Sequence, residues 1–402
     1  MAILLTKYKR CNGGNEMELK INRKINQVKP SMIRQMKALA DTYEDVIDFT
    51  LGEPHVFHQT YLTIKEGLHQ RIMENSIGYS NHYGVKELRK AIVEYCKQHY
   101  NQVYDEDKEI IITSGVSESI SAVLKTILED EDEVIIFSPA FSLYKSNVEM
   151  YGGKVVIYDM IANDMTIKQA ELSQLITSKT KAIIINSPCN PTGKVFSKEE
   201  TQMIYDCIKD YPIFIITDEI YREITFDGIE CYSLSDYKDL RNRLFILNGV
   251  SKSFAMTGWR IGYVLGPEEY IGIVANVHQN FVASSSTISQ YAVLEALKYP
   301  ELTQYIHNLY QFNRDYVYEQ LKPYFKHVIL PEGAFYLYLD TSNFSLTSKE
   351  FAMKLLNDTH VAIVPSVAFE SYDSGYIRLS YCCDSKVLKE GIERIKKFIK
   401  SL

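Results

Sequence analysis

Short runs of apolar, β-branched residues alternate along the chain with longer segments in which apolar residues recur at helical spacing. Runs that are apolar at consecutive positions are typical of strands covered on both faces, and the segments between them are long enough for crossover helices. The predicted strands are residues 110–113, 134–137, 154–158, 181–186, 213–217, 243–248 and 261–266. The pattern therefore predicts an α/β fold around a mostly parallel, seven-stranded sheet.

The pattern changes after about residue 300. A long helix over 301–321, a strand over 334–340 and a closing amphipathic helix over 385–402 indicate a second, smaller α+β domain. A chain of 402 residues also exceeds the length at which a single hydrophobic core stops growing. We therefore expect a large domain over 51–295 and a small domain over 296–402.

Composition narrows the classes of function. Hydrophobic residues make up 46% of the chain and charged residues 24%, which is typical of globular proteins and excludes a largely disordered one. The formal net charge of -7 gives no basic surface for a phosphate backbone, so nucleic acid is not expected as a partner. No apolar run approaches the roughly 20 residues that cross a bilayer, so no membrane partner is expected either.

Cysteine usage and the N-terminus give no sign of export. The seven cysteines form no CxxC pair, so neither a metal site nor a disulfide framework is predicted, and a cytoplasmic location is expected. The apolar part of residues 1–16 is too short for a good signal peptide. Met17 begins a segment that reads as a natural start, so we expect residues 1–16 to be an upstream extension or a poorly ordered tail.

Residues that can carry chemistry follow three of the predicted strands. Asn190, Asp218 and Lys252 each lie just past such a strand. Open α/β sheets bind ligands at the carboxyl ends of their strands, so we expect these three residues in one crevice. A lysine there can bind an aldehyde cofactor covalently as a Schiff base, although a single lysine is more often a solvated charge.

A phosphate site is predicted at TSGVSES, residues 113–119. A strand ends there, Gly115 lets the backbone approach a ligand closely, and a helix is expected to begin near Ser117. The free amide groups and the dipole at a helix N-terminus bind phosphate. The alternative is that Ser117 only caps the helix.

Four segments, in this order along the chain, carry a family resemblance: NSPCNPTG (186–193), TDEIY (217–221), SKSFAMTGWRIG (251–262) and YIRLSY (376–381). The chain resembles the class I and II aminotransferases of the pyridoxal phosphate fold type I superfamily from about residue 25 to its C-terminus. The resemblance implies that residues 17–50 join the small domain, which closes over the substrate. It also implies pyridoxal phosphate as the cofactor and ping-pong transfer of an amino group from an L-amino acid to a 2-oxo acid.

The resemblance assigns roles around the cofactor ring. Lys252 would bind the cofactor and act as the catalytic base and acid, while Asp218 would keep the pyridine nitrogen protonated. Asn190 and Tyr221 match the pair that hydrogen-bonds the phenolic oxygen of the ring, and Phe141 stands where the family stacks an aromatic on the ring face. The alternatives are that Asp218 caps a helix start and that Phe141 only fills the core.

The resemblance also implies how the phosphate and the substrate are held. The phosphate-binding residues would be Gly115, Val116, Ser117 and Arg260, with Ser251 as a substitute for the usual serine, which is Gly249 here. Tyr79 matches a tyrosine that reaches the phosphate of the neighbouring subunit, which implies a homodimer with shared active sites. Arg378 would bind the substrate carboxylate through two parallel donors, with Asn190 and the backbone of Gly52 beside it.

Substrate identity follows less directly. Between Arg260 and Arg314 there is no arginine to bind a distal carboxylate, so strict aspartate specificity is not expected. Residues 248–267 and 277–290 are most similar to the bacterial aminotransferase A branch, which includes N-acetyl-LL-diaminopimelate aminotransferases; His55 departs from the usual aspartate of that family. The family's common acceptor is 2-oxoglutarate.

Two rival functions share this scaffold. A carbon-sulfur lyase or a decarboxylase would use the same early steps, since the fold does not settle the outcome. A pyridoxal phosphate-binding regulator would need an added DNA-binding domain, for which the fifty or so residues before LGEP leave no room.

Overall fold

The computed structural model describes residues 21–26, 28, 30–54, 56 and 58–402. The expected extension over 1–16 and the unusual His55 lie outside these residues. Within the described part, no helix is long and apolar enough to cross a bilayer. The same residues contain no group of three or more His, Cys, Asp or Glu side chains placed to hold a metal ion.

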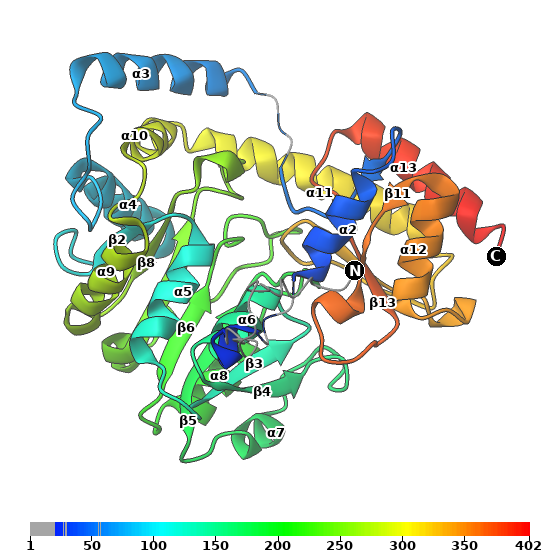
Figure 1. The fold of residues 1–402 in the computed structure, drawn as a ribbon, viewed down its shortest axis with the longest axis horizontal. Coiled ribbons are helices and arrows are strands. Elements are labelled where there is room, and N and C mark those ends of the chain that lie inside the picture. Colours follow the sequence, from blue (N-terminus) through cyan, green and yellow to red (C-terminus); the bar gives the residue numbers. More distant parts are fainter. Residues whose placement is uncertain (1–20, 27, 29, 55, 57) are drawn as a thin grey trace, which may run out of the picture.

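A seven-stranded sheet in the order β2-β8-β7-β6-β5-β3-β4 forms the centre of the molecule (Figure 1). Its strands are β2 (Ile110–Thr113), β3 (Glu133–Ser138), β4 (Lys154–Asp159), β5 (Thr180–Asn186), β6 (Phe214–Asp218), β7 (Leu244–Gly249) and β8 (Gly262–Leu265). Only β8 runs antiparallel to its neighbours, β2 and β7. The predicted α/β fold with a mostly parallel sheet is therefore confirmed, and each strand lies within one residue of its expected limits.

Helices cover both faces of this sheet because successive strand side chains point to opposite sides. Ala182 and Ile184 of β5 pack in one apolar cluster, whereas Ile183 and Ile185 pack in the other. The first cluster includes α5 (Val116–Ile127), α6 (Ser142–Met150) and α9 (Glu268–Val282), and the second includes α4 (Lys86–Tyr100), α7 (Gln169–Gln174), α8 (Lys198–Ile208) and α10 (Thr287–Ala296). Helix α3 (Thr60–Glu74) lies on α10 at the edge of the molecule (Figure 1).

The C-terminal part of the chain carries a second, four-stranded antiparallel sheet in the order β12-β13-β10-β9. Its strands are β9 (His327–Ile329), β10 (Tyr336–Asp340), β12 (Val364–Pro365) and β13 (Tyr376–Ser380), and its helices are α11 (Glu301–Leu321), α12 (Ser348–Thr359) and α13 (Ser385–Ile399). Tyr338 on β10 stands directly opposite Arg378 on β13. The predicted change to a smaller α+β arrangement after residue 300 is present, and α13 ends a few residues before the expected limit.

The N-terminal segment is hydrogen-bonded to the C-terminal part. Strand β1 (Ile47–Asp48) pairs in parallel with β11 (Val361–Ala362), and α2 (Met32–Ala40) contacts β11 and β12 (Figure 1). The remaining short elements are α1 (Arg23–Asn26) and the 3-10 helices η1 (Leu234–Asp236), η2 (Lys238–Arg243), η3 (Thr257–Trp259), η4 (Ser342–Phe344) and η5 (Ser366–Ala368). The domain limits given above stay predictions.

Candidate active site

The carboxyl ends of three adjacent parallel strands bring Asn190, Asp218 and Lys252 to one edge of the large sheet, since β5, β6 and β7 are neighbours. Asn186 at the end of β5 joins two of them. Its Nδ2 donates to the Asp218 carbonyl at 2.9 Å, and its Oδ1 accepts from the Asn190 amide at 2.9 Å. The loops after β5 and β6 are thereby fixed relative to each other.

Lys252 points toward the segment that precedes α3. Its Nζ donates to the Gly52 carbonyl at 2.6 Å and lies 5.7 Å from the centre of the Phe335 ring. Burial, together with the positive charges of Arg260 and Arg378, lowers the pKa of the Lys252 amine from 10.5 to about 8. A larger share of the amine is therefore neutral, and nucleophilic, near neutral pH than in an exposed lysine.

Asp218 is a buried carboxylate that is bonded to neutral groups. Oδ2 accepts from the Tyr144 hydroxyl at 2.6 Å and Oδ1 accepts from the Ile220 amide at 3.2 Å. Burial raises the pKa of Asp218 to about 6, although both hydrogen bonds act in the opposite direction. No helix begins at Asp218, so the alternative that it caps one is wrong. A carboxylate held in this way is suited to a cationic N–H donor.

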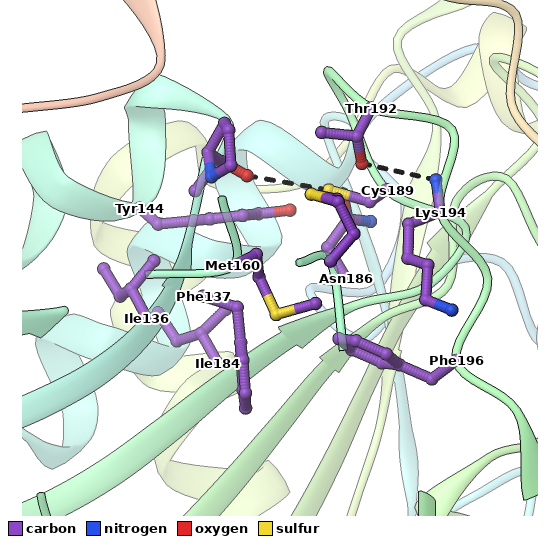
Figure 2. A pocket seen from close by; sticks show the side chains of 13 residues that line it. Ile136, Phe137, Tyr144, Met160, Ile184, Asn186, Cys189, Thr192, Lys194 and Phe196 are labelled. Atoms are coloured by element: carbon purple, nitrogen blue, oxygen red, sulfur yellow. Dashed lines mark hydrogen bonds between the residues drawn. The ribbon is translucent and has the colours of Figure 1, made fainter. Parts of the chain in front are cut away.

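Tyr144 was not singled out in the sequence, yet it is the hydroxyl partner of Asp218. It lies on α6, one helical turn after Phe141, and the two rings are 5.9 Å apart at 87°. Figure 2 shows Tyr144 and Asn186 in the wall of a cavity whose other walls include the apolar side chains of Ile184 and Phe196. Tyr144 and Asn186, which are both hydrogen-bonded to Asp218, therefore lie next to apolar side chains. This environment fits the raised pKa of the Asp218 carboxyl.

Arg378 is 1% exposed, and among the described residues no carboxylate lies within salt-bridge distance of it. Nη1 donates to Asn190 Oδ1 at 2.8 Å, Nη2 donates to the Thr50 carbonyl, and Nε has no acceptor. The rings of Tyr336 and Phe369 lie 4.4 and 4.7 Å from the guanidinium carbon. A buried positive charge without an anion is costly, so this site favours a bound carboxylate.

Tyr221 and Tyr336 connect the Arg378 and Lys252 sides of the site. Their hydroxyls are 2.8 Å apart, and burial raises the pKa of both, that of Tyr336 to about 12. A Cβ at Gly52 would lie 1.8 Å from the Tyr336 hydroxyl, so only glycine fits there. Tyr336, like Tyr144, was not predicted from the sequence.

The predicted phosphate-binding residues form a second group. Helix α5 begins at Val116, and its N-cap is Gly115 at φ 85°, so the alternative that Ser117 caps the helix is wrong. The first amide groups of a helix have no acceptor within it. A Cβ at Gly115 would lie 2.7 Å from Nη2 of Arg260, so the guanidinium stands directly at this helix start. Amide donors and a positive charge thus meet at one point.

Two predicted residues are not joined to either group. Ser251 is buried, but the described residues include no hydrogen-bond partner for its hydroxyl. Tyr79 is 93% exposed in the loop between α3 and α4 and contacts neither group.

These features fit pyridoxal phosphate with an amino acid beside it. The buried carboxylate of Asp218 suits a protonated ring nitrogen, and the helix start at Gly115 with Arg260 suits a phosphate. The amine of Lys252 suits an aldehyde, and the unpaired guanidinium of Arg378 suits an α-carboxylate.

Comparison with known proteins gives a consistent result. Residues 44–395 match the family model described as aminotransferase class I and II. The chain is 37% identical, over 95% of its length and 96% of the relative's, to a protein of Bacillus subtilis named probable N-acetyl-LL-diaminopimelate aminotransferase. It is 33% identical to aromatic-amino-acid aminotransferase 2 of Thermococcus litoralis, over 94% of the chain and 97% of that relative. Among solved structures, aspartate aminotransferase from Thermus thermophilus with maleate superposes with a TM-score of 0.88 at 30% identity, covering 95% of this chain and 100% of that one.

Proposed function

The chain belongs to the class I and II aminotransferases, and from this premise we propose that Lys252 is its catalytic residue and that Arg378 binds the substrate carboxylate. The protein is an aminotransferase, and the cofactor of this class and fold is pyridoxal phosphate. The observation that carries the proposed site is a pair of basic side chains: the partly buried Lys252 with its lowered pKa, and the buried Arg378, which has no anionic partner among the described residues.

The ring of the cofactor would be held between Asp218 on one side and Asn190 and Tyr221 on the other. Asp218 would accept from the ring nitrogen, with Tyr144 holding the carboxylate in place. The Nδ2 group of Asn190 and the hydroxyl of Tyr221 are the donors available for the phenolic oxygen. Phe141, near Tyr144, would cover one ring face.

The phosphate would be held by the amides of the first turn of α5 at Gly115, Val116 and Ser117, together with the guanidinium of Arg260. Ser251 is buried and remains the proposed substitute for the usual serine. A helix start and one arginine supply directional donors and positive charge to a dianion.

When bound, pyridoxal phosphate draws electrons from the α-carbon of the amino acid once its proton has left. The protein residues orient and move that proton. Arg378 fixes the amino acid by its carboxylate, and the Lys252 Nζ takes the α-proton and later returns a proton, which its lowered pKa favours near neutral pH. The Asp218 carboxylate would keep the ring nitrogen protonated throughout the reaction.

For the substrates, we propose an amino donor not restricted to aspartate and 2-oxoglutarate as the acceptor. Apolar side chains, those of Ile33, Leu51, Phe141 and Phe369, gather in one cluster beside Arg378. The similarity to the Bacillus subtilis relative makes N-acetyl-LL-diaminopimelate the first donor to test. A panel of donors with 2-oxoglutarate, followed by glutamate formation, tests this. Activity confined to aspartate would contradict the proposed donor range, and activity confined to aspartate or to aromatic donors would exclude N-acetyl-LL-diaminopimelate as the donor.

The reaction itself is tested by its first half. Purified enzyme with bound cofactor, mixed with an amino acid and no acceptor, should release one equivalent of 2-oxo acid and convert its cofactor to the amine form, as ping-pong transfer requires. The Lys252→Ala variant should not do so. Continuous release of pyruvate and ammonia from cystathionine would indicate a lyase instead.

We also propose a homodimer with shared active sites. Tyr79 is 93% exposed, and Ile77 beside it is 53% exposed. The Gly78 carbonyl accepts from Thr287 Oγ1 at 2.7 Å, which holds this loop on the start of α10, where Ile288 is also exposed. An ordered, exposed apolar patch of this kind is typical of an interface between subunits.

Mixed subunits test the sharing of sites. Lys252→Ala removes the amine of its own site, whereas Tyr79→Ala is expected to impair the site of its neighbour. Random pairing of the two variants leaves one intact site in each mixed dimer, so about a quarter of wild-type activity should return. Activity no higher than that of the two variants kept apart would contradict shared sites, and a monomer in light scattering would contradict the dimer.

A further inference from the structure

A buried acid and histidine pair lies behind the first turn of α5. Glu118, the third residue of the helix, is hydrogen-bonded through Oε1 to Nδ1 of His278, which lies on α9 and is fully buried. The other oxygen, Oε2, accepts from the Ser114 amide at 2.5 Å. Among the described residues, Nε2 of His278 has no partner. Glu118 therefore links α9 to the peptide that immediately precedes α5.

Ser114 is bonded on both sides. Its amide donates to Glu118, and its carbonyl accepts from Nη2 of Arg260 at 3.4 Å. Gly115 follows directly and begins the row of amides at the helix start. One peptide thus sets the position of both components of the proposed phosphate site, the amides and the arginine.

The charge of Glu118 needs a partner at this place. The helix dipole stabilises a carboxylate in the first turn. However, the Glu118 carboxylate stands close to the position proposed for the phosphate dianion, and the two negative charges repel each other. Nδ1 of His278 donates to the carboxylate and offsets part of its negative charge. Without that donor, a side chain only 10% exposed would keep an unbalanced charge beside the phosphate.

We propose that Glu118 and His278 are positioning residues for the cofactor phosphate. Glu118 holds the Ser114 peptide so that the amides of α5 and Arg260 converge, and His278 orients and neutralises Glu118. The inference rests on the proposed phosphate site at the start of α5. Neither residue touches the cofactor in this account.

The test compares two ligands that differ only in the phosphate. Dissociation constants of pyridoxal phosphate and of pyridoxal are measured on cofactor-free enzyme by absorbance titration. Glu118→Ala and His278→Leu should each weaken pyridoxal phosphate binding about tenfold, the factor that one charge-assisted hydrogen bond supplies, and change pyridoxal binding less than about twofold. Glu118→Gln keeps an oxygen for the Ser114 amide and should recover most of the lost affinity. His278→Leu fills the buried volume, so it is expected to fold.

Two further variants separate the possible outcomes. Val274→Ala shortens a buried side chain of α9 and should lower thermal stability without changing the ratio of the pyridoxal dissociation constant to the pyridoxal phosphate dissociation constant. Arg260→Ala should lower that ratio if the phosphate lies at the start of α5, and an unchanged ratio would overturn the proposed phosphate site. If Arg260→Ala lowers the ratio but Glu118→Ala and His278→Leu behave like Val274→Ala, the pair is only structural and the inference is wrong.

Discussion

Replacement of Arg378 by methionine should separate substrate binding from folding. Arg378 is 1% exposed, and its guanidinium has two neutral acceptors among the described residues, Asn190 Oδ1 and the Thr50 carbonyl. Methionine leaves these acceptors without their donor but also removes an uncompensated buried charge, so the free energy of unfolding should change by less than about 2 kcal/mol. A substrate carboxylate would lose two charge-assisted hydrogen bonds of about 1.5 to 3 kcal/mol each, which lowers kcat/KM by roughly 10² to 10⁴.

The assay compares an amino acid with a primary amine that has the same side chain and no carboxylate. The first half of the reaction is followed with both, and urea unfolding is measured alongside. Arg314→Met is the matched control, because Arg314 is equally buried but makes two bonds of 2.8 Å to Asp227. It should lose more stability than Arg378→Met and keep the preference for the carboxylate. An equal loss of rate for the amine and the amino acid in Arg378→Met would refute the reasoning.

Three further predictions follow from the buried groups. The pKa of Lys252 is about 8 in the folded, cofactor-free chain and 10.5 when exposed, so the wild type should lose stability as pH falls from about 10.5 to about 8. Lys252→Met should therefore gain stability relative to the wild type over that window, and a difference in unfolding free energy between the two proteins that stays constant with pH in urea unfolding would contradict this. The pKa of Asp218 is raised from 3.8 to about 6, so the wild type should lose stability as pH rises between these values; Asp218→Asn should therefore be the more stable cofactor-free protein at pH 7 in urea unfolding while binding pyridoxal phosphate more weakly. Tyr144→Phe removes a hydrogen bond that lowers the pKa of Asp218, so kcat should fall about tenfold and the acid limb of its pH profile should move to higher pH; an unshifted limb would mean that Tyr144 does not act through Asp218.

The sheet and the site residues that directly follow its strands could be predicted because their sequence signals are local. Consecutive β-branched residues mark strands buried on both faces, and the end of a parallel strand places its next residues at a known edge. Asn190, Asp218 and Lys252 therefore come together as expected once β5, β6 and β7 are neighbours.

The supporting residues depend on packing that the sequence does not display. Tyr144 is hydrogen-bonded to Asp218, from which it is separated by 74 positions in the sequence. Its place one helical turn after Phe141 is the one local feature that could have marked it as a site residue. Tyr336 becomes the partner of Tyr221 because β10 pairs with β13 in one register. A shift of that register by one residue would turn Tyr336 to the other face.

Longer connections were beyond sequence reasoning altogether. His278 lies 160 positions from Glu118, and nothing in either segment marks the pair before α5 and α9 are packed together. From the sequence alone, such a histidine cannot be distinguished from a charged residue on the surface. Its bond to Glu118, and the lack of a partner for its Nε2 in the described part of the chain, are visible only in three dimensions.

The central claim is that the side chain of Lys252 binds the cofactor aldehyde. Borohydride reduction of the purified enzyme, followed by proteolysis and mass mapping, tests it most directly. The account predicts a single pyridoxyl-modified peptide containing Lys252, and no modified peptide from Lys252→Ala. A modification on a different lysine, or a protein that takes up no pyridoxal phosphate at all, would contradict it.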